Sequence, residues 1–298
     1  MKYRLLGRTG LNVSVIGIGT WQFGGEWGVD YSQGEANAVL RRGKELGINL
    51  IDTAECYGDH LSERLIGGFL KEDRREDWIV ATKFGHRFKS NFSRDDLASP
   101  EAVQKQLEDS LRALQTDYVD LYQFHSLPDR DFDNDALWTM LDKQKQAGKI
   151  CCLGISIGAN TNIYQTDKAT DYGADVIQVV YNRLDRKPEA EVFPSCERQN
   201  LGVLARVPLA SGFLSGKYRK GVVFPDNDHR SRGNAAVEER ARMLDEVERI
   251  REEEVPEGVP MSEWALAWCL RHPAVHSVIP GCKTPEQVEA NARAAELL

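Results

Sequence analysis

The sequence lacks the features of a membrane or secreted protein. No apolar run approaches the length of a membrane-spanning helix. The first ten residues, MKYRLLGRTG, contain no long apolar stretch followed by a small-residue cleavage site. We therefore expect a cytoplasmic protein that does not bind a membrane.

Cysteine pairs and excess positive charge are also missing. The six cysteines form no C-x-x-C pair and no Cys/His cluster at zinc spacing, so we expect reduced, buried thiols and no metal. The chain has 38 Lys and Arg residues and 46 Asp and Glu residues. The resulting formal charge of -8 disfavours nucleic acid or anionic lipid as a partner. We expect a small-molecule ligand and a monomer or weak homo-oligomer.

Short β-branched or apolar runs alternate along the chain with longer charged segments of helical period. The 298 residues, 41% of them hydrophobic, suffice for one α/β barrel or two smaller domains. The predicted strands are 13–20, 48–53, 78–83, 118–125, 150–156, 176–182, 202–209 and 276–280. The predicted helices are 34–47, 60–72, 99–115, 133–147, 161–172, 262–272 and 284–295.

This alternation predicts a parallel (β/α)₈ barrel, because each strand is apolar enough to be covered on both faces. A doubly wound sheet is the alternative. Residues 2–12 are expected to form a hairpin that plugs one end of the barrel. Residues 211–252, after the seventh strand, are too long for a simple loop, and we expect an excursion with a charged helix from about 235 to 252. We treat residues 1–298 as a single domain.

Polar residues stand at the ends of the predicted strands, where packing alone would favour apolar ones. They are Thr20, Asp52, Lys83, His125, Ser156, Gln178 with Asn182, and Arg206. Because the active sites of (β/α)₈ barrels lie at the carboxyl ends of the strands, these side chains are predicted to face one mouth.

Four residues in this set suit the reduction of a carbonyl group. A Lys83 ammonium favours the phenolate form of Tyr57 and is expected to lower the tyrosine pKa, while Asp52 keeps the lysine charged. His125 is placed to donate a hydrogen bond to a substrate oxygen. A nicotinamide would supply the hydride.

The sequence closely resembles the aldo-keto reductase superfamily over nearly its whole length. The motifs that carry the resemblance are GIGTWQFGG (17–25), IDTAECYGDHLSERLIG (51–67), VATKFG (80–85), DYVDLYQFHSLP (118–128), GKICCLGIS (148–156), IQVVYN (177–182), VPLASGFLSGKY (207–218) and VIPGCKTPEQVEAN (278–291). The resemblance implies an NAD(P)-binding (β/α)₈ barrel with a catalytic tetrad of Asp52, Tyr57, Lys83 and His125. Tyr57 would be the general acid.

The resemblance also implies a set of cofactor-binding residues. Ser156, Gln178 and Asn182 would bind the nicotinamide carboxamide, and Lys283 with Thr284 favours the 2′-phosphate of NADPH, with NADH as the alternative. The full set is Thr20, Trp21, Asp52, Ser156, Gln178, Arg206, Leu209, Ser211, Gly212, Leu214, Gly216, Lys217, Gly281, Lys283, Thr284, Gln287 and Asn291. The substrate pocket is expected to draw on Trp21, Trp27, Phe84 and His125, with His86 and Phe88 equally well explained by packing.

Two residues depart from the family pattern. Arg206 stands where many members have a tyrosine that stacks on the nicotinamide, and its fixed charge would penalise the oxidised ring. Alternatively, Arg206 would bind an anionic substrate or pair with an acid from the excursion at 211–252. Ile157 follows Ser156 where a Ser-Asn pair is common, which places one cofactor contact in question.

Three functions follow as hypotheses. The preferred one is an NADPH-dependent reductase of aldehydes or ketones. The second is a sensor or regulatory protein that binds the cofactor with little turnover, as some relatives attached to ion channels do. The third is a barrel aldolase that uses Lys83 as a Schiff base.

Overall fold

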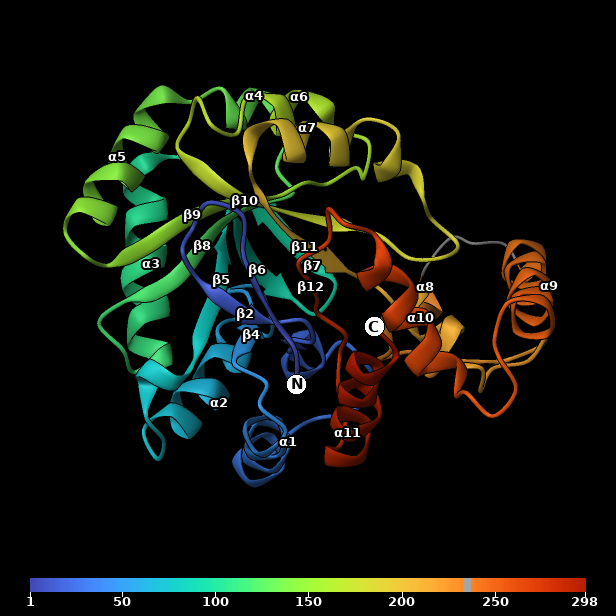
Figure 1. The fold of residues 1–298 in the computed structure, drawn as a ribbon. Coiled ribbons are helices and arrows are strands. Elements are labelled where there is room, and N and C mark those ends of the chain that lie inside the picture. The colour runs from blue at the N-terminus through green and yellow to red at the C-terminus, as the bar shows by residue number, and fades with distance from the viewer. Residues whose placement is uncertain (233–236) are drawn as a thin grey trace.

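An eight-stranded parallel sheet forms the centre of the molecule, in a computed structural model that describes residues 1–232 and 237–298 (Figure 1). The sheet closes on itself, because Ile16 pairs with Val278 and Gly19 with Gly281 in parallel bridges between its first and last strands. The predicted (β/α)₈ barrel is confirmed. Its strands in spatial order are β3 (Ile18–Gly19), β4 (Leu50–Asp52), β5 (Ile79–Phe84), β8 (Val119–His125), β9 (Ile150–Ser156), β10 (Ala174–Val180), β11 (Gly202–Arg206) and β12 (Ser277–Val278).

Closure of the barrel depends on a glycine. A Cβ atom on Gly19 would lie 2.7 Å from the carbonyl oxygen of Ile279, closer than two such atoms approach in real proteins. The missing side chain lets the Gly19 amide donate to the carbonyl of Pro280 at 3.0 Å.

Helices surround the sheet (Figure 1). Those that follow the strands are α1 (Gln33–Glu45), α2 (Leu61–Leu70), α3 (Pro100–Leu114), α5 (Asp135–Gln146), α6 (Ile163–Asp167), α7 (Val192–Gln199), α10 (Met261–Arg271) and α11 (Pro285–Arg293). The predicted start signals are confirmed. The Ser99 hydroxyl accepts from the amide of Ala102, and the Thr284 hydroxyl accepts from the amide of Gln287, each just before a proline in the first turn.

The N-terminal hairpin closes one end of the barrel, as predicted. It consists of β1 (Tyr3–Leu5) and β2 (Asn12–Ser14), which pair antiparallel. Leu6 and Val13 are fully buried against inward-facing strand residues such as Leu50, Leu121 and Leu204. A hydrophobic plug therefore fills this end, and the opposite mouth is left for a site.

The excursion after β11 packs beside the mouth and has a small core of its own. It contains the 3₁₀ turn η4 (Ala210–Ser215), α8 (His229–Arg232) and the charged helix α9 (Val237–Glu253). The predicted helix began at about 235, and its first two positions lie outside the described residues. Phe213, Phe224 and Ile250 are buried together with Trp264 of α10, so the excursion is held against the barrel by apolar contacts.

Several elements differ from the sequence-based expectation. The predicted strand 13–20 is divided between β2 (Asn12–Ser14) of the hairpin and β3 (Ile18–Gly19) of the barrel, and the short helix α4 (Asp129–Phe132) was not predicted. A hairpin of β6 (His86–Ser90) and β7 (Ser93–Asp96) projects after β5, and α7 follows β10; neither was predicted. The helix expected at 161–172 is only α6, Ile163–Asp167. The hairpin strands are partly or fully exposed and highly charged, so they lack the apolar alternation by which a strand is recognised.

Candidate active site

A cavity of about 430 Å³ opens at the carboxyl ends of the strands. This volume lies within the range of small-molecule sites. Most of the residues expected to bind cofactor or substrate line it, although they come from distant parts of the chain. They are Thr20, Trp21, Trp27, Asp52, Tyr57, His125, Gln178, Arg206, Leu209, Ser211, Gly212, Lys217, Gly281, Lys283, Gln287 and Asn291.

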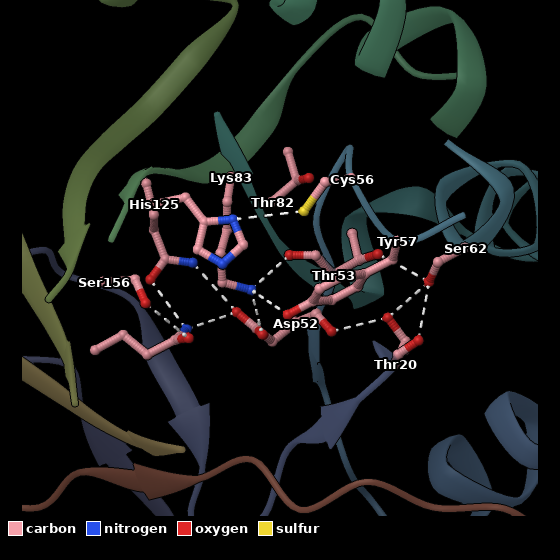
Figure 2. Close-up of polar contacts among 12 residues, drawn as sticks. Thr20, Asp52, Thr53, Cys56, Tyr57, Ser62, Thr82, Lys83, His125 and Ser156 are labelled. Carbon is pink, nitrogen blue, oxygen red and sulfur yellow. Dashed lines mark hydrogen bonds and ion pairs between the residues drawn. The ribbon is translucent and has the colours of Figure 1, made fainter. Parts of the chain in front are cut away.

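The four residues of the predicted tetrad lie together at this mouth (Figure 2). The Lys83 Nζ atom donates to the Asp52 carboxylate at 2.7 Å and to the carbonyl of Thr53 at 2.7 Å, and it lies 3.4 Å from the Tyr57 hydroxyl. Lys83 and Asp52 are 1% and 3% exposed. Since β4 and β5 are neighbouring parallel strands, their carboxyl ends bring this acid and this base into contact.

Asp52 is fully engaged by its surroundings. Its second carboxylate oxygen accepts from the side-chain amides of Gln178 at 2.7 Å and Gln123 at 3.2 Å. The ammonium and the two amide donors thus engage both oxygens of this buried carboxylate. Asp52 therefore holds Lys83 in place and keeps it charged.

A close backbone contact positions the Tyr57 turn. The turn passes so near η1 (Trp21–Gly24) that a Cβ on Gly24 would lie 2.7 Å from the Tyr57 carbonyl carbon. A hydroxyl network fixes the same region: Ser62 Oγ lies 2.9 Å from both Thr53 Oγ1 and Thr20 Oγ1 (Figure 2). The phenol is thereby placed by backbone packing as well as by its own contacts.

The expectation of a lowered Tyr57 pKa is wrong for this structure. Burial raises the pKa of Tyr57 to about 12, and the nearby Lys83 ammonium lowers it only in part. Burial alone would lower the pKa of Lys83, but the Asp52 carboxylate and the Tyr57 oxygen reverse this, and the net pKa is raised. At neutral pH the pair is therefore a neutral phenol beside a charged ammonium, which suits a proton donor.

His125 is a neutral imidazole at the cavity wall. Burial lowers its pKa well below the usual range, and the positive charges of Lys83, Arg94 and Arg206 act in the same direction. Its Nδ1 atom lies 3.8 Å from the Cys56 sulfur (Figure 2). Burial raises the pKa of Cys56, so that residue is a thiol, and if it donates to Nδ1 the ring's N–H lies on Nε2.

Glu55, Cys56 and His125 each bring one potential metal-ligating atom to within 4.8 Å of the others. Burial and the nearby Glu63 raise the pKa of Glu55 to about 8, so both Glu55 and Cys56 carry a proton at neutral pH. Metal binding would have to displace both protons. The chemistry of the cluster thus favours hydrogen bonding, and the absence of a metal stays a prediction.

The far end of the cavity carries a set of cations that fits a phosphate-bearing cofactor. Lys217, Arg230 and Lys283 all line it. Gly212 has a φ of +91°, which favours glycine, and its backbone lies beside the Tyr218 ring and the Arg230 guanidinium, since a Cβ there would contact them at 3.4 Å and 3.5 Å. Glycine and arginine or lysine donors are the groups that bind a pyrophosphate closely.

A few predicted residues do not line the cavity. Lys83 lies beneath Tyr57, and Ser156 is buried with its hydroxyl 3.4 Å from the side chain of Gln178. The Thr284 hydroxyl caps helix α11, and the Asn182 side chain accepts from the amides of residues 184 and 185 in the turn after Asn182.

Two further predicted residues of the excursion also lie outside the cavity lining. Leu214 is fully buried in the core of the excursion, and Gly216 contacts Met261.

Phe84 requires a correction. It was expected to touch the substrate, but its side chain is fully buried and packs on Tyr122 and Phe124, with ring centroids 4.7 Å and 5.9 Å away. The β5 side chains alternate in direction, so Lys83 points toward the mouth and its neighbour Phe84 points into the layer beneath the helices.

Two arginines of the site were missed by sequence reasoning. Arg94, from β7, lines the cavity and pairs with the buried Glu26 at 2.6 Å. Arg230, from α8, pairs with Asp228 at 2.6 Å and lies 4.0 Å from the centroid of the Phe224 ring. Each stands in a charged, polar stretch that resembles a solvated surface, so no signal in the sequence distinguishes it.

Comparison with known proteins identifies the family. The model of the Aldo/keto reductase family matches residues 15–298. The chain belongs to this family.

Solved and curated relatives cover nearly the whole chain. The holo form of the aldo-keto reductase AKR11C1 from Bacillus halodurans is 33% identical, with a TM-score of 0.83, over 99% of this chain and 91% of that one. The NADH-specific methylglyoxal reductase of Escherichia coli is 31% identical over all of this chain and 94% of its own length. A probable voltage-gated potassium channel subunit beta of Arabidopsis thaliana is 29% identical, over 100% of this chain and 92% of the relative.

The family assignment makes the protein an NAD(P)H-dependent oxidoreductase that uses a nicotinamide cofactor. Across residues 1–232 and 237–298, no helix combines the length and the apolar character needed to cross a bilayer.

Proposed function

We propose that this family member reduces aldehydes or ketones to alcohols with NADPH, and that Tyr57 is the general acid. The observation that carries the proposal is the position of the Tyr57 hydroxyl. It lies on the cavity wall, 3.4 Å from an ammonium that Asp52 holds charged. We treat residues 1–298 as one unit in this activity.

The roles of the four residues follow from their contacts. A nicotinamide, when bound, supplies a hydride to the carbonyl carbon. Tyr57 passes its proton to the carbonyl oxygen, and Lys83 stabilises the phenolate that is left. His125 donates from Nε2 to the same oxygen and holds the carbonyl toward the phenol. Asp52 does not touch the substrate and acts through Lys83.

Binding of the cofactor uses the two ends of the cavity. Gln178, with Ser156 behind it, would hold the carboxamide, and Ser211, Gly212 and Lys217 would surround the pyrophosphate. Lys283 lies at the start of α11, half-buried and next to Arg230, where a phosphate on the adenosine ribose would be neutralised. This supports NADPH, while the name of the Escherichia coli relative makes NADH the alternative to test.

The substrate side of the cavity is aromatic. The rings of Trp21 and Trp27 meet edge to face at 5.2 Å, and Trp21 lies parallel to Tyr57 at 6.0 Å. An apolar wall beside the proton donor excludes water and suits an aldehyde or ketone with an apolar or aromatic portion.

Consumption of NADPH with 4-nitrobenzaldehyde tests the reductase directly. We expect turnover with NADPH, a weaker response to NADH, and a smaller preference between them in Lys283→Ala. Tight cofactor binding without turnover of any carbonyl compound in a broad screen would contradict the reductase and support the sensor function. The channel-subunit relative is the observation that keeps the sensor function in view.

The aldolase function is not supported by the state of Lys83. A Schiff-base lysine must lose its proton to attack a carbonyl, but Lys83 is 1% exposed, paired with Asp52, and has a raised pKa. Borohydride should therefore trap no substrate on this chain.

A further inference from the structure

The hairpin of β6 and β7 contributes one side chain to the cavity, that of Arg94. Among the hairpin residues 86–96, only Arg94 lines the cavity wall. Its positive charge acts on both Tyr57 and His125, so the guanidinium lies at the tetrad end of the cavity. The proposed proton transfer gives this charge no role.

A buried acid anchors the guanidinium away from the cavity. The Arg94 Nη2 atom donates to Glu26 Oε2 at 2.6 Å, and the indole N–H of Trp21 donates to the same oxygen at 2.6 Å. The other Glu26 oxygen accepts from the amide of Phe92 at 2.7 Å. The side chain of Glu26 is 1% exposed and does not line the cavity, whereas that of Arg94 is 24% exposed and does. Glu26 therefore fixes the guanidinium and leaves its cavity side open.

Most of the donors of Arg94 are unused. A guanidinium has five N–H donors, but in the described part of the chain only Nη2 has an acceptor. The Nε atom is shielded from solvent and has no partner there. Buried donors are normally satisfied, so this arginine lacks an acceptor that the protein itself does not supply. A carboxylate is the group whose shape and charge match a guanidinium.

The tetrad end carries one positive charge in excess. Lys83 pairs with Asp52, and Arg94 pairs with Glu26. Arg206 pairs with no acid in the described part of the excursion, contrary to one of our alternatives, and donates instead to a backbone carbonyl just after β9 at 3.1 Å. Asp52 is the one acid among the described residues that line the cavity. A substrate anion at this end would therefore be attracted.

We propose that Arg94 binds a carboxylate on the substrate, so that the protein prefers carbonyl compounds with an acid group remote from the carbonyl. The inference rests on the proposed function and narrows its substrate class. Trp21 lies between the two groups, because its N–H shares Glu26 with Arg94 and its ring lies parallel to Tyr57. A substrate with its carbonyl at Tyr57 and its carboxylate at Arg94 needs a spacer about the size of an aromatic ring.

Two aldehydes of nearly the same shape test the charge. 4-Carboxybenzaldehyde is an anion at pH 7, and 4-nitrobenzaldehyde is neutral. Because the nitro group also activates the carbonyl, the informative quantity is the change between variants in the ratio of kcat/KM for the two aldehydes. Arg94→Gln should lower this carboxylate preference at least about tenfold, which corresponds to about 1.4 kcal/mol. Arg94→Lys should lower it less, and an unchanged ratio in Arg94→Gln overturns the proposal.

Arg87 supplies the matched control. It lies on the same hairpin, is 66% exposed, pairs with Asp95 and does not line the cavity. Arg87→Gln removes the same charge and should leave the preference within about twofold of wild type. An equal loss in both variants would show long-range steering by the hairpin and contradict a carboxylate site at Arg94.

Variants of Glu26 separate ligand binding from a structural role. Glu26→Gln retains an oxygen for the Trp21 indole but removes the anion that competes for Arg94, so the carboxylate preference should rise. The double variant Glu26→Gln with Arg94→Gln leaves no buried charge unpaired and should keep the low preference of Arg94→Gln. If Arg94 only holds Glu26 and Trp21 in place, each variant should change kcat/KM for both aldehydes by the same factor, and the proposal fails.

Binding without turnover distinguishes this inference from the proposed function. The complex with NADP⁺ has no hydride to transfer, so calorimetry with 4-carboxybenzaldehyde measures affinity alone. If the wild type reduces no carbonyl compound yet binds this aldehyde at least about tenfold more tightly than Arg94→Gln does, the proposed function fails and the Arg94 site stands. If the wild type is an active reductase whose carboxylate preference is lost in Arg206→Gln but kept in Arg94→Gln, the site lies at Arg206 and our assignment is wrong.

Discussion

The two ends of the cavity are held by different kinds of structure. At the tetrad end, Asp52 and Lys83 stand on paired strands of the barrel, and Tyr57 follows the first of them directly. At the other end, a strap of residues 226–230 crosses from the excursion to the loop after η1. There the amide of His229 donates to the Glu26 carbonyl at 2.8 Å and the amide of Gly28 donates to the Asn227 carbonyl at 3.1 Å.

The contacts of the two ends differ in the elements that supply them. Every polar atom of Asp52 and Lys83 at the tetrad end has a partner inside the barrel. The strap contains the Arg230–Asp228 pair, whose side chains are 9% and 2% exposed, and backbone hydrogen bonds connect it to the loop after η1. The comparison teaches that the sheet positions the tetrad, while loops build the phosphate end of the cavity.

Removing the phenol should have the largest effect. In Tyr57→Phe, kcat should fall by about 10²–10⁴, because the proposed general acid that delivers the proton to the carbonyl oxygen is lost. Affinity for NADPH should change little, since the hydroxyl contacts Lys83 rather than the phosphate end. Steady-state kinetics and calorimetry measure the two quantities.

Tyr218→Phe is the matched control at the other end of the cavity. Its hydroxyl accepts from Arg230 at 2.7 Å, so the loss should weaken cofactor binding and leave the chemical step intact. Wild-type turnover in Tyr57→Phe would contradict the assignment of the chemical step to the tetrad end and of cofactor binding to the other end.

Breaking the buried ion pair should be costly for folding. Lys83→Met leaves the Asp52 carboxylate buried without its ammonium and should lower the free energy of unfolding by about 3–5 kcal/mol. The double variant Lys83→Met with Asp52→Asn should recover much of this stability and remain inactive. Denaturant unfolding provides the measurement, and Lys220→Met, which breaks the exposed pair with Asp245, should be nearly neutral.

Much of the tetrad end could be predicted from the sequence. Asp52, Lys83 and His125 terminate apolar runs, and parallel strands necessarily gather their carboxyl ends, so periodicity alone places these residues together. The sequence could not predict whether burial or the Lys83 charge would have the larger effect on the pKa of Tyr57. The net effect on the Tyr57 pKa depends on how completely the turn after β4 is covered by η1, which only the folded chain determines.

At the phosphate end, the predicted Lys217 and Lys283 line the cavity, but Arg230 was not predicted, and Arg94 was missed as well. Both arginines lie in stretches with no apolar period, and their burial depends on the Arg94–Glu26 pair and on contacts of Arg230 with the rings of Trp27 and Phe224. Phe84 shows the converse error, since a position next to Lys83 suggested the cavity while the alternation of β5 sends it into the core. The residue types in the sequence indicate the chemistry of the site, but only tertiary packing determines which loop residues line the cavity.

A third prediction concerns Glu55, a buried acid next to the tetrad, and the dependence of stability on pH. The pKa of Glu55 is raised by burial and by Glu63 from 4.5 to about 8, so the folded state holds this proton more tightly than the unfolded one. The associated stability is fully present below pH 4.5 and is lost as pH rises through about 8. Glu55→Gln removes the dependence and keeps the oxygen that accepts from the His86 amide.

We therefore expect Glu55→Gln to be more stable than wild type near pH 7, by roughly 3 kcal/mol, with the advantage disappearing near pH 4.5. Urea unfolding at several pH values measures it. Glu26→Gln, at a buried acid paired with Arg94, should instead destabilise at neutral pH. A Glu55 variant that loses stability at every pH would show that the carboxylate is ionised and useful.

Removing Arg230 should have the smallest effect on catalysis and should act on retention of the ligand. Asp228 holds Arg230 through two side-chain bonds, at 2.8 Å and 2.6 Å, and is 2% exposed, so Arg230→Met removes a cation from the phosphate end and, by leaving a buried carboxylate unpaired, should also lower the free energy of unfolding. We expect NADPH to dissociate about tenfold faster in stopped-flow experiments, which corresponds to about 1.4 kcal/mol. Arg219→Met is the control, because Arg219 is exposed and bonds only to nearby carbonyls.

If release of the oxidised cofactor limits turnover, kcat in Arg230→Met should rise while kcat/KM for the carbonyl substrate stays unchanged. A loss of kcat with unaltered dissociation would instead mean that the strap helps to align the tetrad, and the two ends would have to be regarded as one unit.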